Sequence, residues 1–551
     1  MNAVETRIIT EIGNALKELY GLVRDEGFIM IETPRDPKMG DYATNIAMRL
    51  AKELHRNPFD IANEIAAVLR EKLTEASSVE AARPGFINFR MKGESLADNL
   101  KVILEEGDAY GRNDSGKGQK ILVEWVSANP TGDLHCGHAR NAAWGDSISR
   151  LLEASGYDNL REYYINDAGN QIVMLGESLT ARYFEHFGKE YPLPEDGYHA
   201  QDIIDIADAI AETDGDRWLY EEDAEKRLEY FKKEGVRREL KKIEKDLEMF
   251  GVRFDSWMHE TFFYENGGER INAVLERMQR MGLTYEKDGA LWFRSSEYGD
   301  DKDRVLKKSD GTYAYLTPDI ANHVYKYERG YRKLVDLWGA DHHSYITRMK
   351  CALTALGYDR DLLDVDIIQM VRMVEDGVEV KMSKRTGNAI TIRELVEDVG
   401  CDAARWFFVS KDVSSHMDFD FNFARKKSED NPVYYAQYAH ARMCSILRQC
   451  PELKPVETYD LLTDQKEIEL MKYLNEFPTV VADAARTRMP NKICQYIQTV
   501  ARLFHSFYGV CRVNDSANPE LSNQRAALVT AAKITMKNAL YLIGVSAPEK
   551  M

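Results

Sequence analysis

The chain has 551 residues, of which 44% are hydrophobic and 30% are charged, and this globular composition excludes a collagen-like or wholly disordered protein. The formal net charge of −18 argues against a histone-like nonspecific binder of nucleic acid, although one domain can still carry a basic patch. Seven scattered cysteines without a C-x-x-C pair argue against a disulfide framework and a thiolate zinc site, and the lack of any apolar run near about 18 residues predicts a cytoplasmic protein that does not contact membranes.

Residues 1–115 predict a small N-terminal domain. Helical periodicity covers 8–22 and 44–73, and the apolar segment 85–89 is typical of a strand. The polar, glycine-rich stretch 111–118 then favours a linker. We therefore expect an additional α+β domain ahead of the main body of the protein.

Residues 116–430 change to short apolar strands that alternate with helices. Strands are expected at 121–126, 160–165, 334–338 and 365–374, and the clearest helix at 139–154. Strand, helix and strand at this spacing predict a parallel sheet with crossover helices. The charged stretch 188–298, which has a helical pattern over 223–249, is expected to be a helical insertion between two halves of the sheet.

Residues 431–551 are helical throughout, most clearly at 433–448, 465–486 and 523–542. They carry 14 Lys and Arg against 11 Asp and Glu, so this region is mildly basic on an acidic chain. Chance scatter and a surface that faces a polyanion both explain this excess. Together the three regions predict an α/β protein, with a Rossmann-like parallel-sheet catalytic domain that carries a helical insertion, a small α+β N-terminal domain and an all-α C-terminal domain.

The segment 128–138 sits directly after a predicted strand and directly before a predicted helix. In open α/β sheets, ligands bind at the carboxyl ends of the strands, where helix N-termini attract anions. Gly132 and Gly137 allow the backbone to approach such a ligand closely. His135 and His138 could then donate hydrogen bonds to phosphate oxygens as charge develops in a transition state. A loop with incidental histidines is the alternative.

A second cluster, residues 380–388, combines two lysines, an arginine and a serine with a nearby glycine. Lys381 and Lys384 carry point charges on flexible stems, which suit a pyrophosphate leaving group whose charge moves as it departs. Taken alone, such a cluster is better explained as an exposed basic surface loop. The cluster follows the first motif and lies on the second half of the predicted nucleotide-binding sheet. This position favours its interpretation as a pyrophosphate-binding group.

The two motifs together resemble the H-x-G-H and K-M-S-K signatures of class I aminoacyl-tRNA synthetases, in the same order. Further segments are similar to arginyl-tRNA synthetases over essentially the whole chain. These segments are 124–132, 163–171, 309–320, 338–343, 431–442 and 544–551. The chain is therefore identified as a member of this family, and the resemblance implies ATP-dependent ligation of L-arginine to tRNA(Arg) through an arginyl-adenylate.

The resemblance also implies roles for single residues in phosphate chemistry. The catalytic residues would be His135, His138, Lys381 and Lys384. The ATP contacts would be Ala128, Asn129, Pro130, Thr131, Gly132, Asp133, Leu134, His135, Cys136, Gly137, His138, Gly339, Asp341, Met382 and Ser383. Mg²⁺ would arrive with ATP and be held largely by phosphate oxygens, so we expect no metal site made by the protein itself.

Selection of arginine requires a carboxylate that accepts the fork of guanidinium donors, because an uncharged pocket would leave a buried charge unpaired. The resemblance implies that arginine contacts Glu124, Asn129, Tyr315, Asp319 and His343. Asp319 also suits a helix N-cap, which is its alternative role. The adjacent His342 and His343 are a weak metal pair, because neighbouring residues on an extended segment point apart.

The same resemblance implies that residues 1–115 contact tRNA, that 116–430 carry out the reaction, and that 431–551 bind the anticodon, within a monomer. Two other classes of protein are weighed against this one. The length and the helical tail argue against a nucleotidylyltransferase that acts on a small molecule, and the presence of both motifs argues against a synthetase-derived binding protein without catalysis. A cysteine-specific synthetase would need thiolate zinc ligands, and a branched-aliphatic one a much larger editing insertion.

Overall fold

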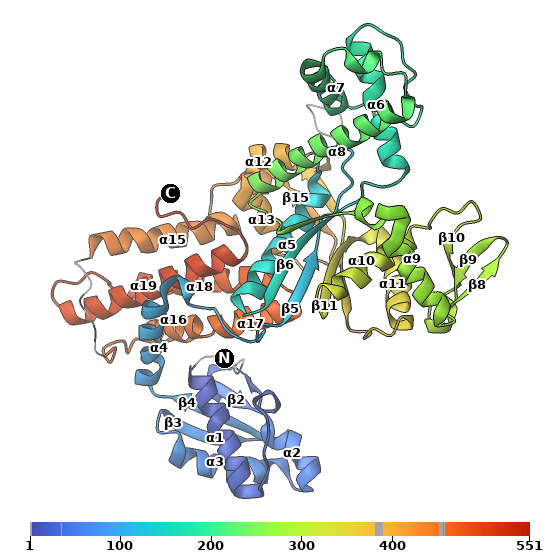
Figure 1. The fold of residues 1–551 in the computed structure, drawn as a ribbon. Coiled ribbons are helices and arrows are strands. Elements are labelled where there is room, and N and C mark those ends of the chain that lie inside the picture. The colour runs from blue at the N-terminus through green and yellow to red at the C-terminus, as the bar shows by residue number, and fades with distance from the viewer. Residues whose placement is uncertain are drawn as a thin grey trace.

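The computed structural model describes residues 3–32, 34, 36–380, 389–450, 454, 456 and 458–551. Figure 1 shows a central sheet with the N-terminal domain below it, a bundle of C-terminal helices on the left and an inserted helical module at the top. No helix within the described ranges is long and apolar enough to cross a membrane.

The N-terminal domain packs helices on a four-stranded antiparallel sheet in the order β1-β2-β4-β3. Its elements are α1 (Ala3–Tyr20), β1 (Ile31–Glu32), β2 (Tyr42–Thr44), α2 (Ile46–Leu54), α3 (Pro58–Lys72), β3 (Ala76–Ala82) and β4 (Phe86–Met91). The helical run expected over 44–73 is divided into two helices, α2 and α3. His55 is left-handed at φ 50°, and Asn57 with Pro58 begins a new helix because proline suits the first helical position.

The central sheet has five parallel strands in the order β12-β11-β5-β6-β7. They are β5 (Lys120–Glu124), β6 (Asp158–Ile165), β7 (Ser256–His259), β11 (Lys333–Gly339) and β12 (Leu363–Ile368). The helix α5 (Cys136–Ala154) lies between β5 and β6, and α11 (His343–Ala355) lies between β11 and β12. The predicted Rossmann-like parallel sheet is thereby confirmed, and its carboxyl edge carries the loops that follow these strands.

The expected strand over 365–374 is two strands in different sheets. β12 ends at Ile368, and β13 (Val371–Glu375) joins a small sheet between β14 (Val378–Glu379) and β15 (Met417–Asp420). Arg140 on α5 holds the break, because its buried guanidinium donates to the carbonyls of Gln369 at 2.7 Å and Asp412 at 2.9 Å. Helices α12 (Ile392–Val399), α13 (Cys401–Val409) and α14 (Phe421–Arg425) complete this region.

The chain between β6 and β7 forms a helical module that projects from the body in Figure 1. It consists of α6 (Asn170–His186), α7 (Gln201–Asp214) and α8 (Ala224–Met249), and its own apolar cluster includes Leu175, Tyr183 and Phe231. The chain then rejoins the central sheet as β7. The elements that follow are α9 (Glu265–Arg280), the antiparallel strands β8 (Thr284–Lys287), β9 (Ala290–Phe293) and β10 (Arg304–Lys307), and α10 (Leu316–Glu328).

The C-terminal region is all-helical, as predicted. Its helices are α15 (Pro432–Gln449), α16 (Gln465–Asn475), α17 (Phe477–Thr487), α18 (Asn491–Val510) and α19 (Pro519–Leu542). The expected helix over 465–486 is two helices, because Pro478 has no N–H with which to continue α16 and stands instead in the first turn of α17. The helix α4 (Gly93–Glu106), which follows the N-terminal domain, packs against α16 and α19.

Arg405 on α13 joins the sheet to the C-terminal helices. Its fully buried guanidinium donates to Asp146 Oδ2 on α5 at 2.6 Å and to the carbonyls of Phe250 and Ile543, each at 3.1 Å. Gly544 follows with φ of 67°, and a Cβ at this position would lie 2.2 Å from the guanidinium. The end of the chain after α19 is therefore held against the body by one buried cation.

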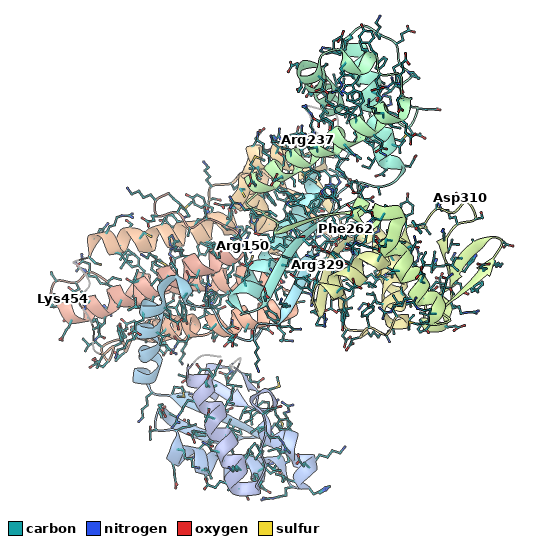
Figure 2. All side chains as sticks on the ribbon, in the orientation of Figure 1. Arg150, Arg237, Phe262, Asp310, Arg329 and Lys454 are labelled. Carbon is teal, nitrogen blue, oxygen red and sulfur yellow. The ribbon has the colours of Figure 1, made fainter. Side chains whose placement is uncertain are left out.

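We expect Arg405→Met to destabilise this junction. Breaking a buried ion pair costs about 3–5 kcal/mol, and the loss should fall at the lower end of that range because Asp146 keeps Arg150 (labelled in Figure 2) as a second partner. The midpoint of thermal unfolding should drop clearly in calorimetry. Arg372→Met, which breaks an exposed pair with Asp418, is the control and should leave the midpoint nearly unchanged. Equal midpoints for the two variants would contradict the prediction.

Candidate active site

The loop that leaves β5 begins with strained backbone. Val126 and Ser127 both lie in the left-handed region, with φ of 63° and 40°, where a β-branched residue is rarely found. Side chains hold this conformation: Asn141 Oδ1 accepts from the Val126 amide, and Ser127 Oγ accepts from the Tyr164 amide and donates to the Glu124 carboxylate. Backbone strain that is maintained in this way concentrates at functional sites.

His135 and His138 lie at the N-terminus of α5, as predicted, and their ring centroids are 3.8 Å apart. His135 Nδ1 accepts from the Gly137 amide at 3.1 Å, and His138 Nδ1 accepts from the His135 amide at 3.3 Å. This assigns the proton of each neutral ring to Nε2, from which it can be donated to a ligand. Glycine is required at position 137, because a Cβ there would lie 2.9 Å from the His135 ring.

Both imidazoles are neutral near pH 7. Desolvation lowers the pKa of His135, and burial together with the neighbouring His135 lowers the pKa of His138 to about 3. Two stacked imidazolium ions would repel one another, whereas two neutral rings keep their N–H donors without that cost. The N-terminus of α5 adds backbone N–H groups and a partial positive charge to the same place. The arrangement therefore suits an anionic group with several acceptor oxygens.

The second predicted motif, with Lys381, Met382, Ser383 and Lys384, lies outside the described residues. The chain that follows it is paired with the first motif. The Cys136 amide donates to the Ile390 carbonyl at 3.0 Å, and the Ile392 amide donates to the Leu134 carbonyl at 2.8 Å. Residues that directly follow the second motif thus lie beside the first motif, at the carboxyl edge of the sheet.

Asp319 and Glu260 form a pair of carboxylates at this edge. Asp319 stands in the first turn of α10, and Glu260 directly follows β7. The Tyr345 hydroxyl donates to Asp319 Oδ2 at 2.5 Å, and the Asn166 amide, oriented by its hydrogen bonds, donates to Glu260 Oε2 at 2.7 Å. Burial raises the pKa of Asp319, and burial together with the charge of Asp319 raises the pKa of Glu260 to about 8. The pair favours a cationic ligand, because a cation stabilises the ionised form of both groups.

The alternative role of Asp319 as a helix N-cap is wrong. The helix α10 begins at Leu316, so Asp319 is already inside it and faces Tyr345 rather than an unpaired backbone amide. Glu260 is a site residue that the sequence analysis missed. It lies in the stretch interpreted as an insertion, and a strand assignment for 256–259 would have placed it at the carboxyl end of a parallel strand, where ligands bind.

Glu124 lies in a buried network of charges next to this pair. The fully buried Lys326 donates to Glu124 Oε2 at 2.6 Å and to Asp336 at 3.4 Å. His323 contacts the other Asp336 oxygen at 2.8 Å and the Asp319 carbonyl at 2.7 Å. Burial raises the pKa of Glu124; burial alone would lower the pKa of His323, but the Asp336 carboxylate raises it overall. The network connects the helix of Asp319 to the strand end of Glu124.

The other predicted contacts are distributed around the same edge. Asn129 is half-buried and donates to Gln171 at 2.5 Å, and Tyr315 turns its side chain to solvent, with 76% of its surface exposed. Asp341 and His343 are also exposed where β11 ends, just after Gly339. The rest of the first motif forms the loop between β5 and α5, namely Ala128, Pro130, Thr131, Gly132, Asp133, Leu134 and Cys136. Within the described part of the chain, no group of three His, Cys, Asp or Glu side chains could hold a metal ion.

A cavity of about 650 Å³ lies next to the carboxylate pair, between α8 and the ends of β6 and β7. Four cationic side chains of α8 line it, Lys232, Lys233, Arg237 (labelled in Figure 2) and Lys241. Trp257 and His259 line the opposite wall, and the hydrogen bond that His259 Nδ1 donates to Asp167 raises the pKa of His259. Glu229, Glu244 and Asp167 line it as well, so the cavity presents both signs of charge together with an aromatic ring.

Three family models match successive parts of the chain. A model described as the arginyl tRNA synthetase N terminal domain matches residues 6–91. A model of the catalytic domain of class I (R) tRNA synthetases matches 99–420, and one of the DALR anticodon binding domain matches 436–551.

Individual relatives agree with these matches. Arginine–tRNA ligase 1 of Halalkalibacterium halodurans is 50% identical over 557 residues, which cover 100% of both chains. The arginine–tRNA ligase of Bacillus subtilis is 52% identical over 527 residues, which cover 95% of this chain and 94% of the relative. The crystal structure of a putative arginyl-tRNA synthetase from Campylobacter jejuni has a TM-score of 0.77 at 35% identity and covers 84% of this chain and 100% of its own. This chain belongs to the arginyl-tRNA synthetase family of class I aminoacyl-tRNA synthetases.

Proposed function

We propose how this chain, an arginine–tRNA ligase by its family membership, carries out its reaction. In the first step the carboxylate of arginine attacks the α-phosphorus of ATP, and pyrophosphate leaves. In the second step the terminal ribose hydroxyl of tRNA attacks the mixed anhydride, and AMP leaves. The proposal rests on one observation above all: residues 390–392, which follow the second motif, pair with residues 134–136 of the first motif.

ATP would bind along the segment 128–138, with Gly339 and Asp341 on the neighbouring strand end. The Nε2–H groups of His135 and His138 and the N-terminus of α5 are suited to phosphate oxygens on which charge develops. Lys381 and Lys384, with Met382 and Ser383 between them, would follow that charge onto the leaving pyrophosphate. Mg²⁺ held by the phosphate oxygens would neutralise further charge. No covalent enzyme intermediate is needed, so catalysis comes from positioning and electrostatics.

The guanidinium of arginine would lie between Asp319 and Glu260. Two carboxylates that repel one another are each stabilised by a cation with several donors, and Tyr345 and Asn166 keep both in fixed orientations. Lysine would offer one compact ammonium in place of a planar fork, and a neutral amino acid would leave the carboxylates unpaired. Asn129, Tyr315 and His343 would complete the contacts to the rest of the amino acid. Glu124 would act from within its network with Lys326.

The tRNA would contact all three proposed domains, 1–115, 116–430 with its helical module between β6 and β7, and 431–551. On the C-terminal helices the rings of Tyr434 and Tyr438 are stacked, and Arg442 lies over the ring of Tyr508 at 4.9 Å. These rings are half-buried, and surface rings and cations of this kind can bind unpaired bases. The cavity along α8, to which four cationic side chains contribute, would admit the tRNA end to the adenylate. The enzyme would act as a monomer in the cytoplasm.

The function is tested by pyrophosphate exchange and tRNA charging with each of the twenty amino acids. With total tRNA present, we expect only arginine to support both reactions, because only its guanidinium satisfies two buried carboxylates. Exchange that proceeds equally with lysine, or arginine activation without any transfer to tRNA, would overturn the proposal.

His138→Ala should lower kcat for arginine activation by about 10²–10³-fold, the loss of about 2.7–4 kcal/mol seen when one oxyanion donor is removed. The Kd for arginine should stay near that of the wild type, since the carboxylate pair is unchanged. His138→Gln is the matched control: its amide can place an N–H near the former Nε2 and should recover part of the rate. Near-normal turnover of the alanine variant would remove His138 from the mechanism.

The Asp319–Glu260 pair predicts a pH dependence of arginine use. Below about pH 8 the free pocket holds a proton on Glu260 that arginine must displace, so kcat/KM for arginine should rise with pH and level off above the pKa. The expected slope approaches tenfold per pH unit between pH 6.5 and 7.5. A profile that stays flat over this range would show that Glu260 does not bind the guanidinium.

Asp319→Asn tests the second carboxylate of the same pair. Loss of the charge should reduce arginine binding by about 2–5 kcal/mol while KM for ATP stays constant. The inflection of the pH profile should also move to lower pH, because the charge of Asp319 helps to raise the pKa of Glu260. Glu269→Gln, which neutralises an exposed carboxylate on α9, should change neither quantity. An unchanged arginine KM in Asp319→Asn would reopen the choice of amino acid.

A further inference from the structure

The helix α8 belongs to two apolar cores. Its first half carries Phe231 and Val236, which are buried in the cluster of the projecting module with α6 and α7. Its second half carries Ile243 and Leu247, which are buried in the main core together with Ile392 of α12. Figure 1 shows the helix running from the module down to the body. Because both halves of α8 are packed, this rigid helix fixes the position of the projecting module relative to the main body of the protein.

At the junction of the two halves, Lys242 binds the loop of the first motif. Its ammonium lies 3.0 Å from Asp133 Oδ1, 3.2 Å from Asp202 Oδ2 on α7 and 3.2 Å from Glu239 Oε2 one turn earlier on α8. Burial alone would lower the pKa of Lys242, but the three carboxylates raise it overall, so the cation is retained. Burial raises the pKa of the fully enclosed Glu239 to about 7. One cation therefore holds three carboxylates from three segments together.

One turn further along the same face, α8 holds the start of α12. Asp246 is buried and accepts from Arg393 Nη2 at 2.6 Å. Arg393 directly follows Ile392, whose amide pairs with the loop of the first motif, and Asp133 also raises the pKa of Arg393 after the larger effect of Asp246. Residues 239, 242 and 246 have the i, i+3, i+7 spacing that places side chains on one face of a helix. That face thus contacts the first-motif loop at Asp133 and the chain that follows the second motif at Arg393.

From this juxtaposition we propose that Lys242 is a positioning residue for adenylate formation. Lys242 holds the first-motif loop through Asp133, and Asp246 on the same helix holds the start of α12 through Arg393. The helix thereby fixes the position of one segment relative to the other. The inference rests on the proposed function and adds to it a residue that touches neither ATP nor arginine. In-line attack on the α-phosphorus needs groups from both motifs in register, and a displacement of about 1 Å can cost about 10²-fold in rate. The same ion pairs make the projecting module part of the catalytic geometry.

The test is Lys242→Met in the full-length enzyme, assayed by arginine-dependent pyrophosphate exchange at saturating tRNA. We expect kcat to fall by about 10–100-fold, with the KM values for ATP and arginine within about threefold of the wild type, because ground-state contacts remain and alignment is lost. Lys242→Arg keeps the charge and should recover part of the rate. Lys245→Met is the matched control on the same helix; Lys245 is exposed, has no ion pair among the described residues, and its loss should leave kcat unchanged.

Without Lys242 the three carboxylates would repel one another, and this repulsion could slow the enzyme by itself. A second variant distinguishes that effect from the loss of positioning. Lys242→Met/Glu239→Gln removes the most buried of these charges but cannot restore the contact to Asp133. The double variant should remain slow, with the unfolding midpoint and tRNA affinity of the wild type, and Asp133→Asn should add little to the defect of Lys242→Met. Wild-type kcat in Lys242→Met, or recovery in the double variant, overturns the inference. Failure of the wild type to activate arginine would instead overturn the proposed function.

Discussion

Two backbone hydrogen bonds join the loop of the first motif to the chain that follows the second motif. The amides of Cys136 and Ile392 donate to the carbonyls of Ile390 and Leu134, so a loop after β5 and a loop after β14 run side by side. Backbone pairing of this kind does not depend on side-chain rotamers, and it fixes the distance between the two segments. In the proposed function the histidines of the first motif and the lysines of the second serve one phosphate chain, and this contact keeps the segment after the second motif next to the first.

One edge of the sheet carries two groups of side chains, one suited to an anion and the other suited to a cation. At the N-terminus of α5, desolvation keeps two histidines neutral, which provides donors for an anion without mutual repulsion. Toward the other side, burial and proximity raise the pKa values of Asp319 and Glu260, which prepares a place for a cation. Burying carboxylates is costly even where Tyr345 and Asn166 donate to them, so this pair lowers the stability of the free protein, and a bound cation would offset that loss.

The inserted module belongs to this electrostatic arrangement. One face of α8 contributes Lys233, Arg237 and Lys241 to the cavity, and another face carries Lys242 and Asp246, which contact Asp133 of the first-motif loop and Arg393 at the start of α12. A polyanion that binds the first face acts on the same rigid helix that holds the active-site loops. This gives a physical route by which occupation of the module and alignment of the phosphate site can be linked.

Much of the site was accessible from the sequence because its signals are local. Glycines, a strand and a helix start around 128–138 are adjacent in the chain, and they correctly predicted the placement of His135 and His138. Two errors also had local causes: Pro58 and Pro478 each begin a new helix inside a run whose apolar periodicity continues without interruption. Reading those prolines as helix starts would have divided 44–73 and 465–486 correctly.

The sequence by itself determined the parallel α/β core, the helical C-terminal region and the first-motif histidines, because periodicity and turn residues act over a few positions. Tertiary structure alone decided that 365–374 divides between two sheets, that Glu260 faces Asp319, and that Lys242 reaches Asp133. Each of these three features depends on which elements pack against one another in space. Strand order is set by the packing of whole faces against one another, and a one-dimensional pattern shows which face of an element is apolar without showing its neighbour.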